Sequence, residues 1–262
     1  MACNYTYNNS CSILFKYPVN KKMKYIIGCS GFSYPEWKDT FYPPKLAKNK
    51  WLHYYSQHFD SVELNVTFYR TMKPEFFQKI YAEVHEDFVF SVKAPRIITH
   101  FKRFVNTQED VHSFYASVDE GLKNKLGCIL FQLTPLLHYS GDKLQSILPQ
   151  LNTDYKNVLE FRHSTWWDPA VYDALRKSGI SFCMTSYPGL PDDLIPTSPI
   201  VYIRLHGVPQ LYKSDYSRKY LQDIASAIKE LKNINEVYIY FDNTMSLNAI
   251  KNAETMRELI GS

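Results

Sequence analysis

The chain has 262 residues, of which 45% are hydrophobic and 21% charged, and these proportions are ordinary for a globular protein. Its formal net charge of +4 permits an anionic partner, but proteins whose sole role is to bind nucleic acid usually carry a larger or more clustered basic excess. No run approaches the roughly 20 apolar residues of a membrane-spanning helix, so we expect no membrane partner.

The five cysteines predict free thiols rather than a disulfide framework. Their number is odd, no pair has CxxC spacing, and Cys29, Cys128 and Cys183 fall within apolar segments that we predict to be strands. Buried free thiols are typical of a reducing compartment. Because the N-terminal region also has no basic segment followed by a long apolar one, we expect a cytoplasmic protein.

The first 23 residues predict a tail outside the fold. They are rich in Asn, Tyr, Ser and Lys and show no sustained hydrophobic period, so we expect residues 1–23 to be disordered. A single domain is predicted over residues 24–262, and it opens with a strand at 24–27 that leads into a glycine-bearing turn.

Seven further strands are predicted along the domain. The second begins at Ser61, where Val62 and Leu64 alternate with polar neighbours, and its polar end reaches Arg70. The others are predicted at 88–92, 128–133, 158–162, 180–185, 201–205 and 237–241. Residues 128–133 form an almost unbroken apolar run, which is typical of a strand covered on both sides.

Helical patterns separate most of these strands. They lie at about 45–58, from Pro74 onward, after Thr107, and at 142–148, 168–179, 221–231 and 248–260. Thr107 and Asp168 are predicted N-caps, and Gly179 is predicted to end its helix. The Pro-rich segment 187–199 leaves little room for a helix, so we expect that one to be short or missing.

The alternation of strands and helices predicts a parallel sheet, and eight such units predict closure into a (β/α)8 TIM-type barrel. An open doubly wound sheet is the competing fold. Eight strands in a chain of this size favour the barrel, and no glycine-rich dinucleotide or P-loop motif supports the open sheet.

Six motifs in sequence order resemble those of one known family. They are 28–34 (GCSGFSY) with Trp37 and 41–43, 62–65 (VELN) with 67–70 (TFYR), 90–96 (FSVKAPR) with Thr99 and His100, 130–133 (LFQL), 159–163 (LEFRH) with Trp166, and 202–207 (YIRLHG). On these motifs the chain is identified as a member of the DUF72, or YecE-like, family from about Lys24 to the C-terminus.

The resemblance implies a (β/α)8 barrel with a fold-level likeness to the endonuclease IV and xylose isomerase barrels. It implies no settled activity, because fold analogy is weak evidence for function. The chain departs from the family pattern at the eighth strand, where Asp242 stands in place of the first of two asparagines and Leu247 stands where a glycine is expected.

Polar residues at the carboxyl ends of the strands form the candidate site, since these ends converge on one mouth of a barrel. The predicted acid–base residues are Glu63, Glu160 and His206. The predicted substrate-binding residues are Ser30, Asn65, Tyr69, Lys93, Arg96, His100, Gln132, Arg162, Arg204, Asp242 and Asn243.

A structural role is the alternative for part of this set. Glu63, Glu160, Arg162 and Arg204 alternate with apolar neighbours, so they can also fill the barrel interior as interlocked ion pairs. Aromatic residues near the strand ends can likewise stack on a ligand or pack beneath the rim; they are Trp37, Phe41, Tyr42, Phe68 and Tyr69.

Metal-ligand residue types also occur at the mouth, namely His100, His163, His206, Glu63, Glu160 and Asp242. No two of them share a ligand-like local spacing, and cationic side chains crowd the same region. We therefore name no metal ligands, and no particular cofactor follows from the sequence.

The mixed charge at one mouth favours a barrel that binds a phosphorylated or nucleic-acid-derived anion and transforms it by acid–base chemistry, as a hydrolase or isomerase would. A non-catalytic nucleic-acid-binding protein is the first alternative. A metal-dependent phosphodiesterase or sugar isomerase is the second, and it rests on fold analogy alone. The sequence does not predict the oligomeric state.

Overall fold

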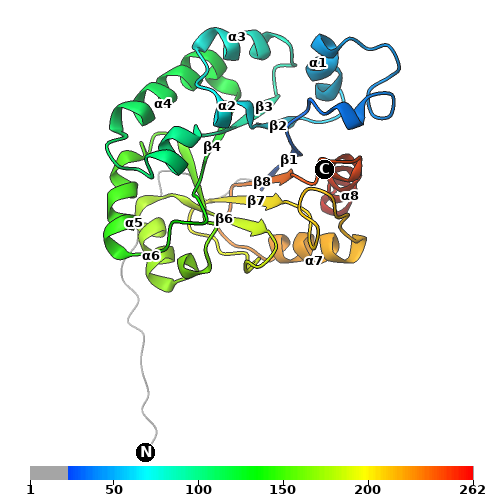
Figure 1. Cartoon of the computed structure of the whole chain (residues 1–262). Coiled ribbons are helices and arrows are strands. Elements are labelled where there is room, and N and C mark those ends of the chain that lie inside the picture. The colour runs from blue at the N-terminus through cyan, green and yellow to red at the C-terminus, as the bar shows by residue number, and fades with distance from the viewer. Residues whose placement is uncertain (1–22, 262) are drawn as a thin grey trace, which may run out of the picture.

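A computed structural model describes residues 23–261 of the chain. Its eight strands close into a barrel in the order β1 to β8, and every neighbouring pair is parallel, including β1 with β8. Helices surround the barrel on the outside (Figure 1). The predicted (β/α)8 barrel is confirmed, whereas residues 1–22 of the tail predicted at 1–23 lie outside the described residues.

The strands start close to their predicted positions. They are β1 (Lys24–Ser30), β2 (Ser61–Leu64), β3 (Val89–Lys93), β4 (Leu126–Gln132), β5 (Lys156–Glu160), β6 (Ser181–Ser186), β7 (Ile200–Leu205) and β8 (Glu236–Phe241). The largest difference is in the second strand, which ends at Leu64 instead of reaching Arg70. A short helix, α2 (Val66–Tyr69), follows it directly.

The longer helices are α1 (Trp51–Ser56), α3 (Pro74–Ala82), α4 (Gln108–Leu122), α5 (Gly141–Ile147), α6 (Pro169–Ser178), α7 (Arg218–Lys229) and α8 (Asn248–Ile260). The helix predicted at 45–58 is shorter than expected, because Ala47 has extended backbone dihedrals (φ −63°, ψ 139°) and only one 3-10 turn precedes Trp51. No helix connects β6 to β7 in the described chain, as the prolines predict.

The two predicted N-caps have different outcomes. The Asp168 carboxylate accepts a hydrogen bond from the Ala170 N–H at 2.8 Å, and Gly179 ends the same helix with φ 66°, so both boundaries are confirmed. Thr107 also precedes its helix, but its hydroxyl donates to Gln150 Oε1 at 2.6 Å. The predicted side-chain cap at Thr107 is therefore wrong, because a distant glutamine takes the hydroxyl.

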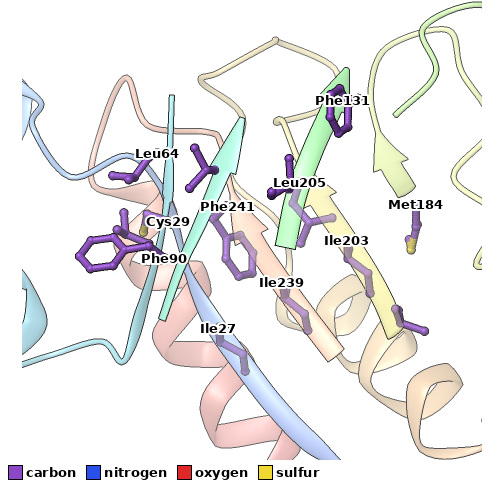
Figure 2. Packing of buried hydrophobic residues seen from close by; sticks show 14 of the residues in the cluster. Ile27, Cys29, Leu64, Phe90, Phe131, Met184, Ile203, Leu205, Ile239 and Phe241 are labelled. Atoms are coloured by element: carbon purple, nitrogen blue, oxygen red, sulfur yellow. The ribbon is translucent and has the colours of Figure 1, made fainter. Parts of the chain in front are cut away.

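The barrel separates two groups of buried side chains. Outward-facing strand residues such as Ile27, Ile203, Ile239 and Phe241 belong to the larger cluster, which extends to the helices (Figure 2). Inward-facing residues form a second cluster that includes Tyr202, Tyr238 and Tyr240, and this group, the tyrosine layer, lies below the polar mouth. Side chains two residues apart on one strand share a face. Mouth residues two positions beyond a tyrosine of this layer, such as Arg204 after Tyr202, therefore also point inward.

The cysteine prediction is confirmed where the structure describes it: Cys29, Cys128 and Cys183 are buried free thiols. Cys3 and Cys11 lie outside the described residues. None of the described helices combines the length and the apolar character that crossing a membrane requires.

Candidate functional site

The candidate site is built from the last inward-facing position of nearly every strand. Ser30, Lys93, Gln132 and Glu160 are the final residues of β1, β3, β4 and β5, and Glu63 and Arg204 are the penultimate residues of β2 and β7. Asp242 directly follows β8. The parallel closed barrel brings these residues, up to 212 positions apart in the numbering (Ser30 to Asp242), to one mouth.

Arg204 is the centre of a buried ion-pair cluster, which we call the Arg204 network. Its guanidinium lies 2.6 Å from Glu63 Oε1, 2.8 Å from Glu160 Oε2 and 3.2 Å from Asp242 Oδ2. The Arg204 side chain has no exposed surface. A guanidinium has five N–H donors in a planar fork, so one such side chain can serve several carboxylates at once.

Glu63 is further held by neutral donors. The Ser30 hydroxyl donates to its Oε1, and the Tyr202 hydroxyl donates to its Oε2 at 2.7 Å. The Ser30 oxygen in turn accepts from Asn65 Nδ2 at 2.8 Å. Glu63 and Ser30 are fully buried, so this part of the network has the satisfied partners that a buried charge requires.

Glu160 joins Arg204 to the outer part of the mouth. Its Oε1 lies 2.6 Å from Arg162 Nη2, and the Thr185 hydroxyl donates to the same oxygen at 3.3 Å. Burial alone would raise the pKa of Glu160, but Arg162 and Arg204 hold that pKa well below its usual range. The pKa of Asp242 is also lowered, since Arg204, His206 and Lys93 together outweigh the effect of burial.

His206 lies between two of these carboxylates. Its Nδ1 is 2.8 Å from Asp242 Oδ2, and its Nε2 is 3.1 Å from Glu160 Oε1. Its side chain is fully buried, as are those of Glu63 and Glu160. The three predicted acid–base residues are thus brought into one network, in which each contacts charged or polar side chains.

Lys93 differs from the other cations of the inner mouth because it has no carboxylate partner. It is 9% exposed, and its Nζ makes no hydrogen bond or ion pair with the described residues. The Nζ lies 4.3 Å from the centre of the Phe68 ring, a cation–π contact. Burial, followed by the charge of Arg204, lowers the pKa of Lys93 to about 8.

Arg162 lies beside the Arg204 network and extends it outward. Its guanidinium lies 4.1 Å from the centre of the Tyr187 ring, and its Nη2 is 3.4 Å from Gln132 Oε1. Its Nε is buried without a hydrogen-bond partner among the described residues. Arg162 therefore keeps an unused donor although it already pairs with Glu160.

The pKa of His100 reflects burial and the positive charge around it. Burial lowers its pKa to about 4, and the charges of Lys93, Arg162 and Arg96 contribute in the same direction. The ring packs edge-on against Phe68, with 4.9 Å between the ring centres. At neutral pH His100 is uncharged and lies in the combined field of three cations.

Exposed apolar side chains are concentrated on the segments that follow strands, which form the rim of the mouth. Among the described residues they are Val66, Tyr69, Phe101, Val105, Leu136, Val208, Tyr212 and Met245. Arg96 is exposed and lies between two of them, with 5.6 Å to the Tyr69 ring centre and 5.2 Å to that of Phe101. Tyr69 and Arg96 thus belong to the rim and not to the buried network.

Asn243 is the predicted site residue that the structure turns away from the network. It is fully buried, and its Nδ2 donates to the Ser214 carbonyl at 2.9 Å and to Asn252 Oδ1 at 2.8 Å. These contacts join the segment after β8 to helix α8. Trp37 and Tyr42 are also fully buried, so they pack beneath the rim.

Tyr187 is a site residue that the sequence analysis did not identify. It stacks on Arg162 and contacts the His206 ring edge-on at 5.6 Å. The signal that could have found it is its position, because it directly follows the last residue of β6. Within residues 23–261, no three His, Cys, Asp or Glu side chains are arranged so that they could hold a metal ion.

Comparisons with known proteins identify the family of the chain. A family model described as "Protein of unknown function DUF72" matches residues 26–262. The UPF0759 protein YunF of Bacillus subtilis (strain 168) is 27% identical over 257 residues, which cover 85% of this chain and 90% of that protein.

Two solved structures have the same fold. A DUF72 family protein (TM1631) from Thermotoga maritima MSB8 has a TM-score of 0.83 and 27% identity, over 91% of this chain and all of that one. A DUF72 family protein (EF0366) from Enterococcus faecalis V583 has a TM-score of 0.76 and 20% identity, over 92% of this chain and 99% of that one. The match to the family model over nearly the whole described barrel shows that this chain belongs to the DUF72 family.

Proposed function

We propose that this chain binds a small phosphorylated or carboxylated anion in the barrel mouth, with Lys93 and Arg162 as the groups that contact it. The observation that supports this most directly is Lys93, a side chain in a residue only 9% exposed, whose ammonium has no carboxylate or hydrogen-bond acceptor among the described residues. Burying an unpaired charge is costly. An anionic ligand would supply the missing partner.

The charge balance of the mouth supports the same proposal. Glu63, Glu160 and Asp242 are already paired with guanidinium groups of the Arg204 network. Lys93 and Arg96 have no ion pair among the described residues, so positive charge is in excess above the network. The lowered pKa of nearby His100 is consistent with that excess.

Arg162 supplies directional donors beside Lys93. Its Nε has no partner among the described residues, and its stacking on Tyr187 fixes the plane of the guanidinium. Arginine binds phosphate and carboxylate groups through parallel N–H donors, which makes it more selective for planar or tetrahedral oxyanions than a point charge is.

The proposed chemistry is proton transfer to or from the bound anion, as hydrolysis or isomerisation of a phosphorylated substrate requires. We assign the proton-transfer role to Lys93, because a pKa of about 8 allows its amine to gain and lose a proton near neutral pH. Glu63, Glu160 and His206 would then act by holding Arg204 and Arg162 in place.

The test is calorimetric titration of the purified full chain with butyl phosphate, a simple phosphate monoester. Lys93→Met should weaken binding by at least about tenfold, equivalent to ~1.4 kcal/mol. Lys229→Met is the matched control, since this exposed lysine ends helix α7 at the far end from the mouth. Equal affinities for the wild type and Lys93→Met would refute the proposal.

Nucleic-acid binding is a second candidate, and the rim arrangement of Tyr69, Arg96 and Phe101 is what favours it. These three exposed side chains offer aromatic faces and a cation, which is the combination that stacks on unpaired bases. Binding of a labelled single-stranded oligonucleotide should weaken with salt and with Arg96→Ala. Retention of full binding in Lys93→Met would separate this activity from the mouth site.

A further inference from the structure

A separate cavity of about 450 Å³ lies next to the mouth, between the segment that follows β6 and the segment that leads into α7. Its walls include Tyr187, Tyr216 and Tyr220 and the carboxylates of Asp192 and Asp215. A volume of this size is in the range of small-molecule sites. None of the functions considered above uses this cavity.

The cavity has the chemistry of a cation site. None of the described residues that line it is Lys, Arg or His. Asp192 Oδ2 accepts from the Tyr220 hydroxyl at 2.8 Å, and Asp215 Oδ1 accepts from Asn252 Nδ2 at 2.8 Å. Both donors are neutral, so they orient the two carboxylates without neutralising them. Tyrosine faces beside carboxylates favour an ammonium group.

The N-terminus of helix α7 opposes a cation here. Ser217, the N-cap residue, lines the cavity, and its hydroxyl oxygen accepts from the Tyr220 N–H. A helix N-terminus carries about half an elementary positive charge, and part of it is satisfied by this cap. Asp192 and Asp215 set two carboxylate charges against this partial charge.

Tyr187 connects the cavity to the mouth. One contact of its ring is with the Arg162 guanidinium, 4.1 Å from the ring centre, and the same residue forms part of the cavity wall. A ligand held by Arg162 therefore lies one aromatic ring away from a site of opposite charge. The two sites together fit a molecule with charges of both signs.

We infer that the ligand is bipolar, with its anionic group at Lys93 and Arg162 and an ammonium group in the cavity between Asp192 and Asp215. This inference rests on the proposed function, because the mouth must hold the anionic end. It adds a substrate class, the amino-substituted phosphates or carboxylates, and a second set of specificity residues.

The experiment compares matched ligands that differ only in the amine. Aminoethyl, aminobutyl and aminohexyl phosphate are titrated calorimetrically into the full chain beside ethyl, butyl and hexyl phosphate. At least one amino compound should bind about tenfold more tightly than its alkyl counterpart, the effect expected for one charged hydrogen bond. Asp192→Asn should remove this preference and leave the affinity for the alkyl phosphates unchanged.

Two controls separate the outcomes. Asp173→Asn removes an exposed carboxylate on helix α6 and should keep the wild-type preference. Lys93→Met should weaken the binding of the amino and the alkyl phosphates by the same factor. Equal binding of amino and alkyl phosphates by the wild type, or an unchanged preference in Asp192→Asn and Asp215→Asn, would overturn the bipolar ligand while the anion site stands. Absence of binding by every phosphate would overturn both.

Discussion

The guanidinium of Arg204 and the carboxylate of Glu63 meet inside the barrel through three hydrogen bonds, although the two residues are 141 positions apart. Neither side chain has any exposed surface. Because Arg204 also contacts Glu160 and Asp242, one guanidinium serves three buried carboxylates. All three carboxylates of the mouth therefore share one cation.

Replacing that cation should destabilise the whole barrel. Arg204→Met leaves the buried carboxylate of Glu63 without its guanidinium partner, and breaking a buried pair in this way costs about 3–5 kcal/mol in the free energy of unfolding. Urea denaturation followed by circular dichroism measures the change. Arg218→Met removes an exposed pair with Glu258 and should cost under about 1 kcal/mol. A loss of similar size in both variants would contradict the central role of Arg204.

Anion binding at Lys93 should depend on pH in a defined direction. The ammonium form binds the anion, and it is lost as the pH rises through the Lys93 pKa of about 8. Affinity for sulfate, whose own charge is constant in this range, should fall by up to about tenfold per pH unit above that value. Calorimetric titrations at several pH values test this. Lys93→Met should bind sulfate weakly with no such fall, and a fall that persists in the variant would assign it to another group.

His100 should make the folded protein sensitive to mild acid. Its pKa is lowered from 6.5 to about 4, so the unfolded chain takes up a proton at a higher pH than the folded chain does. The stabilising contribution is complete above about pH 6.5 and is lost as the pH falls toward 4. Urea midpoints across this window should vary less in His100→Gln than in the wild type. The exposed His112→Gln measures the effect of removing a histidine elsewhere, and equal slopes in all three proteins would refute the prediction.

The close approach of β1 and β2 beneath the site should require glycine at position 28. A Cβ atom at Gly28 would lie 2.0 Å from the Ser61 carbonyl oxygen, and a backbone oxygen cannot move aside as a flexible side chain does. Gly28→Ala should therefore destabilise the protein by about 1–3 kcal/mol or more, as overpacking does. A Cβ atom at Gly141 would have no non-adjacent described residue within 4 Å, so Gly141→Ala should be neutral or stabilising by thermal denaturation. Equal melting temperatures for the two variants would contradict the prediction, because they would show that β1 and β2 can move apart at little cost.

The fold could be predicted from the sequence because its strands are apolar on both faces, as in residues 128–133, and because eight such units recur in order. The segments between strands could not be predicted equally well. Residues 66–69 turn into a short helix and Ile97–Phe101 form a π-helix, because local hydrogen bonds in such short segments leave no hydrophobic period to detect. For the same reason Tyr69 and Arg96 were predicted in the site but lie on its rim.

The positions of the site residues could be predicted from the strand ends, but their partners could not. Nothing in the local sequence relates Glu63 to Arg204, since their contact depends on which strands face each other across a closed barrel. Asn243 shows that a position at a strand end does not by itself place a residue in the site. It lies two residues after the end of β8, yet its amide donates a hydrogen bond to Asn252 because helix α8 packs beside that strand end.

The tyrosine layer leaves the barrel with one accessible end. Tyr202, Tyr238 and Tyr240 fill the interior together with their apolar neighbours, so the interior offers no passage from the mouth to the opposite face. Any molecule that reaches Lys93 must therefore arrive and depart by the same route, past side chains such as Tyr69 and Phe101. Substitutions at these positions will change the rates of entry and exit together, while the equilibrium affinity remains a property of the charged groups beneath.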